Sequence, residues 1–195
     1  MTKVRAPNSD EEVSSAIGFL DALFAGNQGW YVNRDAILPV VKADPQLIVA
    51  AFEDCAIIGV AVFDGSGVIN GIGVDTHYRR RGLGRLLLDG VEQAARSKGF
   101  RRITLGSVDD ATDFYLACGY RATLLVQFRT GEFDLHARAE RLTKDLLKAH
   151  IIKRAEWEGS PQLFVQTNGV DWDLKQMVEK FDHGVVCQFI MGKDI

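Results

Sequence analysis

A run of arginines beside two glycines is the part of this sequence best suited to chemistry. In chain order its residues are Arg79, Arg80, Arg81, Gly82, Leu83, Gly84 and Arg85. The pattern from Arg85 to Lys98 predicts a helix, so these charges would gather at a helix N-terminus. That end already carries unpaired N–H groups and about half a positive elementary charge. Further positive charge is unfavourable there unless a polyanion binds, so the run predicts a phosphate site.

The elements around this run narrow the kind of phosphate site. The pattern from Val68 to Val74 predicts a strand, which gives the order strand, basic glycine turn, helix. A P-loop would end in Gly-Lys-Ser/Thr, and a dinucleotide fingerprint would need a third glycine where this chain has Leu87. Neither motif is present. A solvated basic turn without a ligand stays open as the alternative.

A second motif follows about twenty residues later. The segment from Ile103 to Val108 predicts a strand, and the segment from Asp110 to Cys118 predicts a short helix that carries Phe114-Tyr115 and ends in Gly119-Tyr120. A tyrosine phenol has a pKa of about 10, so it is protonated at neutral pH and can act as a proton donor. An aromatic core residue is the structural alternative for Tyr115.

Together these two motifs resemble the GCN5-related N-acetyltransferase (GNAT) superfamily. The arginine–glycine run resembles its pyrophosphate loop, Gln/Arg-x-x-Gly-x-Gly/Ala, and the second motif resembles its Tyr-x-x-x-Gly-Phe signature. The resemblance covers residues 1–128. It implies an α/β (α+β) fold with a mixed, mainly antiparallel central sheet flanked by helices. It also implies an enzyme that uses acetyl-CoA, without a metal, to acetylate a primary amine by direct attack in a ternary complex.

The resemblance also assigns roles to particular residues. The arginine–glycine run from Arg79 to Arg85 would bind the pyrophosphate, and Tyr115 would be the catalytic acid. A splayed or bulged strand would pair its backbone with the pantetheine arm. The residues of that strand segment are Ile72, Gly73 and Val74.

Two departures from the family pattern leave the chemistry incomplete. Many members have a glutamate on the strand before the loop, where this chain offers only Asn70, with Asp75 at the strand end. Val108 stands where many relatives have an asparagine that contacts CoA. The general base is therefore open between a water chain and the carboxylates at predicted hairpin turns. Those carboxylates are Glu53, Asp54 and Asp64.

Composition sets the broad class of protein. The net charge of −3 argues against a nucleic-acid or membrane surface as the main partner, and no window approaches the length of a membrane span. Three scattered cysteines and four scattered histidines predict neither a disulfide framework nor a metal site. We expect a cytoplasmic enzyme whose acceptor is a small-molecule or peptide amine.

Before the arginine run the pattern predicts an antiparallel meander. An opening strand at 3–6 and a helix capped by Ser9 or Asp10 come first, and a helix at 34–42 contains Pro39. Apolar runs at 47–52 and 57–63 predict a hairpin, which leads into the strand at 68–74.

Residues 129–195 form a second predicted domain, which shares the strand at 123–128. A helix at 133–149, strands at 151–157 and 162–167, a helix at 171–181 and a strand at 185–191 follow that strand. The order β-α-β-β-α-β is typical of a small ferredoxin-like unit. We expect this unit to form a homodimer interface or to close over the substrate.

Three functions are therefore weighed. The leading one is acetyl-CoA-dependent N-acetyl transfer, favoured by Tyr115. The second is a non-catalytic acyl-CoA sensor that lost the strand glutamate and the asparagine and signals through residues 129–195. The third, an interaction module without a ligand, would leave the arginines unexplained.

Overall fold

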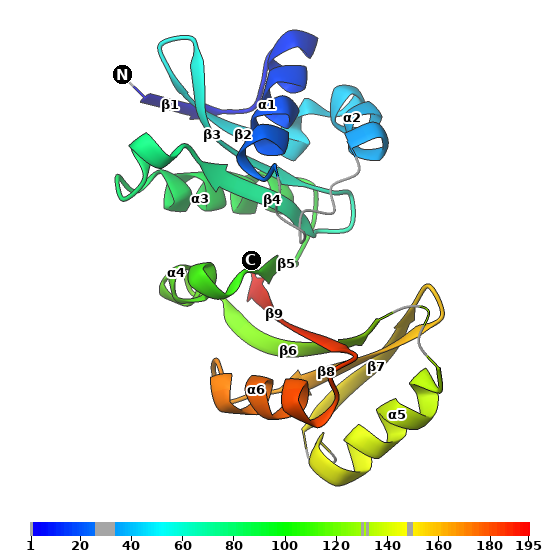
Figure 1. Cartoon of the computed structure of the whole chain (residues 1–195). Coiled ribbons are helices and arrows are strands. Elements are labelled where there is room, and N and C mark those ends of the chain that lie inside the picture. Colours follow the sequence, from blue (N-terminus) through cyan, green and yellow to red (C-terminus); the bar gives the residue numbers. More distant parts are fainter. Residues whose placement is uncertain (1, 26–33, 130, 132, 148–149) are drawn as a thin grey trace. The chain divides into compact units, whose positions relative to one another are not determined.

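The computed structural model describes residues 2–25, 34–129, 131, 133–147 and 150–195. Internal contacts divide the chain into two compact units, Met1–Leu105 with Asp194–Ile195, and Gly106–Lys193. Figure 1 shows the elements of both units. Antiparallel sheets flanked by helices confirm the expected α/β fold class. The sequence-based domain division at residue 128 rests on family resemblance and stays a prediction.

The first unit is built on an antiparallel meander. Its sheet has the order β1 (Thr2–Arg5), β2 (Ile48–Glu53), β3 (Ala56–Phe63) and β4 (Ile69–Val74). The hairpin between β2 and β3 and the strand that follows confirm the predicted meander. The described residues of this unit also form the helices α1 (Asp10–Leu23), α2 (Arg34–Ala43) and α3 (Leu83–Ser97), and β5 (Arg102–Ser107) comes after them.

Helices α1 and α3 cover opposite faces of this sheet (Figure 1). On the α1 face, a Cβ added to Gly73 of β4 would lie 2.2 Å from Leu23. On the α3 face, a Cβ at Gly59 of β3 would lie 3.1 Å from Leu87. Because both faces are covered, β2 and β3 are buried almost throughout and appear in the sequence as continuous apolar runs.

An ion pair joins β1 to the start of α1. The guanidinium of Arg5 donates two hydrogen bonds to the Glu12 carboxylate, at 2.7 and 2.8 Å, and the Asn8 N–H donates a third at 2.9 Å. These bonds to the charged form lower the pKa of Glu12 to about 2, with the Arg5 hydrogen bond as the largest cause. Ser9 caps the helix by accepting from the N–H of Glu12, as predicted.

Acid should therefore weaken the first unit through Glu12. Since the folded pKa lies below the unfolded value, the carboxylate stabilises the fold above about pH 4.5 and that contribution is lost as the pH falls toward 2. We expect the melting temperature of the wild type to fall more between pH 5 and about pH 2.5 than that of Glu12→Gln. Equal falls in both proteins, followed by circular dichroism, would contradict this role.

The second unit contains the remaining elements. Its helices are α4 (Thr112–Ala117), α5 (Leu135–Leu142) and α6 (Trp172–Phe181), and its strands are β6 (Arg121–Phe128), β7 (Ile151–Trp157), β8 (Ser160–Gln166) and β9 (Val185–Asp194). The helix predicted over 133–149 forms α5 and then a π-helical turn, Thr143–Leu147, while 148–149 lie outside the described residues.

The sheet order confirms the split βαβ pattern. The five strands lie in the order β5-β9-β6-β8-β7. Strand β6 is antiparallel to both β8 and β9, and β7 is antiparallel to β8. Helices α5 and α6 lie on one face of the sheet (Figure 1). Arg138 of α5 pairs with the buried Asp182 after α6, and its guanidinium holds the pKa of that carboxyl below the usual value.

Candidate functional site

The arginine run begins a helix slightly earlier than predicted. Helix α3 starts at Leu83 and not at Arg85, because Gly82 is its N-cap with φ of 80°. This left-handed conformation suits glycine, which has no Cβ to clash. Gly82 offers no side chain to cap the first N–H groups of the helix. Those donors are therefore available to a bound anion.

The guanidinium groups of this run are exposed. Arg79, Arg80, Arg81 and Arg85 are all solvent-accessible, and the sequence carries no acidic residue from Thr76 to Leu88. Arg80 adopts a positive φ of 61°, a conformation that costs a non-glycine residue free energy. This turn thus combines like charges, an uncapped helix start and a strained backbone. A bound pyrophosphate would offset the positive charge of the turn.

Two contacts orient the arginines. The Nε of Arg79 donates to the carbonyl of Val74 at 3.2 Å, which ties the loop to the end of β4. The guanidinium of Arg81 lies 5.0 Å from the ring centroid of Tyr78. The Tyr78 hydroxyl in turn bonds to Glu53, and this carboxylate raises the pKa of the phenol. Sequence reasoning missed the Glu53–Tyr78–Arg81 chain, although an aromatic residue directly before an arginine run was a usable signal.

Strand β4 is an edge strand of its sheet, so some of its backbone N–H and C=O groups point away from β3. Asp75 donates to the carbonyl of Ile58 across the pair with β3. Because hydrogen-bonded and non-hydrogen-bonded pairs alternate in antiparallel strands, the N–H and C=O of Ile72 and Val74 point away from β3. Gly73 instead bonds to β3 and packs on α1. Of the segment expected to bind pantetheine, Ile72 and Val74 therefore face away from β3, where the Val74 carbonyl accepts from Arg79 Nε.

The sheet is interrupted on this side of β4. Thr104 of β5 forms an isolated parallel bridge with Val68 and donates to the carbonyl of Gly67 at 3.1 Å. From that point β4 and β5 belong to different sheets. The register of β4 with β3 also slips between Ile69 and Gly71, which makes Asn70 a bulged residue. The splayed strand implied by resemblance is therefore present, with its bulge before Ile72.

Asn70 carries an unpaired buried oxygen. Its Oδ1 is buried and has no hydrogen-bond partner within the described part of the chain. A buried acceptor without a donor is unfavourable, unless a ligand supplies the donor. The carboxylates considered as bases have local partners instead. Asp64 accepts from the N–H groups of Ser66 and Val68, and Asp75 accepts from that of His77.

Tyr115 lies in the second unit on α4. Its side chain is buried, and the residue is 6% exposed. Its ring lies edge-on to Phe114 at 5.2 Å and to Tyr120 at 5.9 Å between centroids. Burial raises the pKa of the Tyr115 phenol, so the group keeps its proton through the neutral range. A protonated phenol is the state that a proton donor requires.

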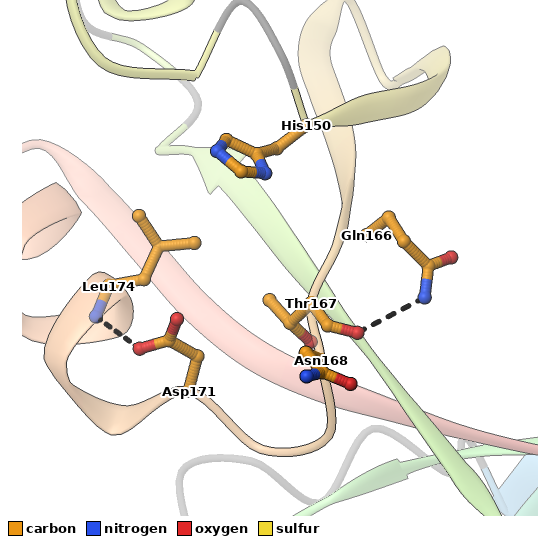
Figure 2. A pocket seen from close by; sticks show the side chains of 6 residues that line it. All are labelled: His150, Gln166, Thr167, Asn168, Asp171 and Leu174. Atoms are coloured by element: carbon orange, nitrogen blue, oxygen red, sulfur yellow. Dashed lines mark hydrogen bonds between the residues drawn. The ribbon is translucent and has the colours of Figure 1, made fainter.

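Two cavities lie elsewhere. A cavity of about 480 Å³ in the second unit lies between the end of β8 and the start of α6 (Figure 2). Its lining residues are His150, Gln166, Thr167, Asn168, Asp171 and Leu174. A smaller one of about 330 Å³ in the first unit includes Arg5 and Gly90. Neither includes the arginine run, whose side chains lie exposed.

Across the described ranges, no three histidine, cysteine, aspartate or glutamate side chains come together as metal ligands would. Within the same ranges, every helix is too short or too polar to span a bilayer.

Comparison with known proteins identifies the family. The model of the acetyltransferase (GNAT) domain matches residues 25–133, more than half of the chain. The chain therefore belongs to the GNAT acetyltransferase family. No curated protein sequence matches it significantly.

Solved structures show the same fold. The structure of yncA from Salmonella typhimurium, with its cofactor acetyl-CoA, has a TM-score of 0.54 at 14% identity, covering 100% of this chain and 94% of that one. Rv2747 from Mycobacterium tuberculosis, in complex with CoA, has a TM-score of 0.53 at 14% identity and 99% coverage of both chains. A GNAT acetyltransferase from Staphylococcus aureus Mu50 has a TM-score of 0.51 at 20% identity, covering 63% of this chain and 84% of that one.

Proposed function

We propose that this chain transfers the acetyl group of acetyl-CoA to a primary amine of a small molecule or peptide. The observation that carries the proposal is the exposed arginine run at the uncapped start of α3, directly after the free edge of β4. Acetyl-CoA has the complementary parts in the same order, a pyrophosphate followed by an amide-bearing pantetheine arm. Solved relatives of the same fold hold acetyl-CoA or CoA.

The proposed residue roles follow from the geometry. The N–H groups of Leu83 and Gly84 and the surrounding guanidiniums would bind the pyrophosphate oxygens, whereas the N–H of Arg85 donates to the carbonyl of Gly82 at 3.1 Å. The backbone of Ile72 and the N–H of Val74 would pair with the pantetheine amides, and an N–H of this edge would donate to the thioester oxygen. The residues proposed to bind CoA are Ile72, Gly73, Val74, Arg79, Arg80, Arg81, Gly82, Leu83, Gly84 and Arg85.

The chemistry proposed is direct transfer. The lone pair of a neutral amine attacks the thioester carbon, the carbonyl oxygen becomes an oxyanion, and its collapse breaks the carbon–sulfur bond. The thiolate leaves and takes a proton from Tyr115, while the amide product loses its extra proton to water. The Tyr115 phenol then regains a proton from solvent.

The test is a release assay for free CoA thiol with a panel of primary amines. Initial rates measured over both substrate concentrations should give intersecting lines in double-reciprocal form, as a ternary complex requires. Parallel lines would indicate an acetylated enzyme and contradict direct transfer. Acetyl-CoA binding without release of thiol for any amine would favour the sensor, which the absence of a glutamate on β4 and the 62% exposed Val108 keep open.

Asn70 is proposed as a contact for the acceptor amine. We expect Asn70→Ala to raise the KM for the amine by about tenfold while leaving the melting temperature unchanged or higher, because the change removes an unpaired buried oxygen. Ser160→Ala is the matched control, since Ser160 Oγ is also buried without a partner but belongs to β8. A KM equal to that of the wild type would remove Asn70 from the acceptor site.

A further inference from the structure

Among the described strands of the second unit, β7 lies at an edge of the sheet. It ends the five-stranded order β5-β9-β6-β8-β7, next to β8. Most of its residues are exposed, and two of them are large and apolar, with Ile152 57% and Trp157 59% exposed. An exposed edge presents a row of free N–H and C=O groups to which another strand can bind.

The hairpin geometry shows which residues of β7 face this edge. Trp157 pairs with Ser160 across the two-residue turn Glu158-Gly159, and such a turn is closed by a hydrogen-bonded pair. Bonded and non-bonded pairs alternate from there. Trp157 and Ala155 therefore bond to β8, whereas the backbone groups of Glu156 and Arg154 point outward. The partner of Glu156 is Pro161, which has no N–H to offer, and this agrees with the assignment.

Charge then selects a register for a second copy of β7. In an antiparallel pair, outward-facing residues must lie opposite one another. A two-fold axis at Ala155 places Arg154 of each copy opposite Glu156 of the other, which gives two attractive pairs. An axis at Arg154 or at Glu156 would place like charges opposite, which is unfavourable. The strand is thus self-complementary in one register.

We infer that β7 pairs with β7 of a second copy about a two-fold axis at Ala155, so that the two five-stranded sheets become continuous. Contacts within the chain already orient the charged side chains. The guanidinium Nη1 of Arg154 lies 2.9 Å from Oε1 of Glu140 on α5, and Nε2 of His136 on α5 lies 4.0 Å from Oε2 of Glu156. In the same register Trp157 lies opposite Lys153 of the second copy, whose alkyl stem and ammonium suit an indole face.

The test is a charge swap followed by analytical ultracentrifugation of the full chain. The wild type should show a mass twice that of the 21.6 kDa chain, in a concentration-dependent equilibrium. Arg154→Glu and Glu156→Arg, made singly, should each raise the dimer dissociation constant by at least about tenfold, because each turns two attractions into two repulsions. The double variant Arg154→Glu/Glu156→Arg should restore the dimer.

The controls separate pairing from folding. Arg154→Glu also loses its contact with Glu140, so melting curves are recorded for every variant. Restoration in the double variant, which cannot restore the Glu140 contact, identifies the contact between copies. Lys3→Glu changes the net charge by the same amount as Arg154→Glu, but on β1, the edge of the other sheet, and should leave the mass unchanged. A monomeric wild type, or a dimer insensitive to either single reversal, would overturn the inference.

Discussion

Replacing Tyr115 with phenylalanine is expected to lower kcat for acetyl transfer by about a hundredfold while leaving the affinity for acetyl-CoA unchanged. The hydroxyl is the only group removed, and the ring keeps its buried edge-on contacts with Phe114 and Tyr120. Burial raises the pKa of the phenol, so the hydroxyl is protonated across the neutral range, although it is a weaker acid than a solvated phenol. The departing thiolate would lose that donor in the variant.

The measurement is steady-state kinetics with free-thiol detection, beside calorimetric titration with acetyl-CoA. Tyr120→Phe is the matched control, because it removes a hydroxyl from the neighbouring ring of the same aromatic cluster. We expect its kcat to stay within about threefold of the wild type. An unchanged kcat in Tyr115→Phe would exclude the phenol from proton transfer and leave it as a core aromatic.

Reversing two charges of the arginine run is expected to weaken acetyl-CoA binding by about a hundredfold or more. In Arg80→Glu/Arg81→Glu, two exposed guanidiniums become carboxylates at the uncapped start of α3. Charge-assisted hydrogen bonds to phosphate are lost, and repulsion of the pyrophosphate replaces them. The stability of the fold should not fall. In the wild type without ligand the like charges of the loop repel one another, and the variant removes part of that repulsion.

Calorimetry and melting curves together check this second prediction. Lys3→Glu/Lys42→Glu gives the same change in net charge at exposed positions of β1 and α2 and should bind acetyl-CoA as the wild type does. Inorganic pyrophosphate should compete with acetyl-CoA for the wild type, and added salt should weaken both ligands. Equal affinity in the loop variant and the control would show that the arginines do not hold the phosphates.

The sequence predicted the elements of the fold well where periodicity and turn residues agree. The strand at 151–157 has the predicted bounds, because the two turn residues Glu158-Gly159 end it sharply. The position of each strand within its sheet was harder to predict. The sheet is interrupted between β4 and β5 because of how strands distant in sequence pair, and local sequence patterns do not determine that pairing.

Helix α3 carries three consecutive leucines, which differ in burial. Leu86 is 49% exposed, whereas Leu87 and Leu88 are buried. The helix begins at Leu83 because Gly82 adopts the left-handed conformation, and its buried face follows from contact with the sheet. Helical spacing alone could not choose between two adjacent leucines.

The sequence could predict the parts of the candidate site that belong to a local motif. It could not predict the parts that depend on tertiary contacts. The arginine–glycine run and Tyr115 were predicted as site residues from motifs that resemble those of the family, and their roles stay predictions. The bulge at Asn70 and the support of Tyr78 by Glu53 were not, because both depend on the register of β2, β3 and β4. Backbone register also singles out Ile72 and Val74, and not Gly73, as the residues facing the free edge.

The place of β9 bears on how this protein is made. Strand β9 lies between β5 and β6, yet it is translated after every other strand of the sheet. Until it emerges from the ribosome, β6 lacks one neighbour, and β5 has not met the strand that pairs with it. Helix α4, which carries Tyr115, connects β5 and β6. Before β9 is synthesised, the facing edges of β5 and β6 have no partner strand. Aggregation can compete with folding during that time.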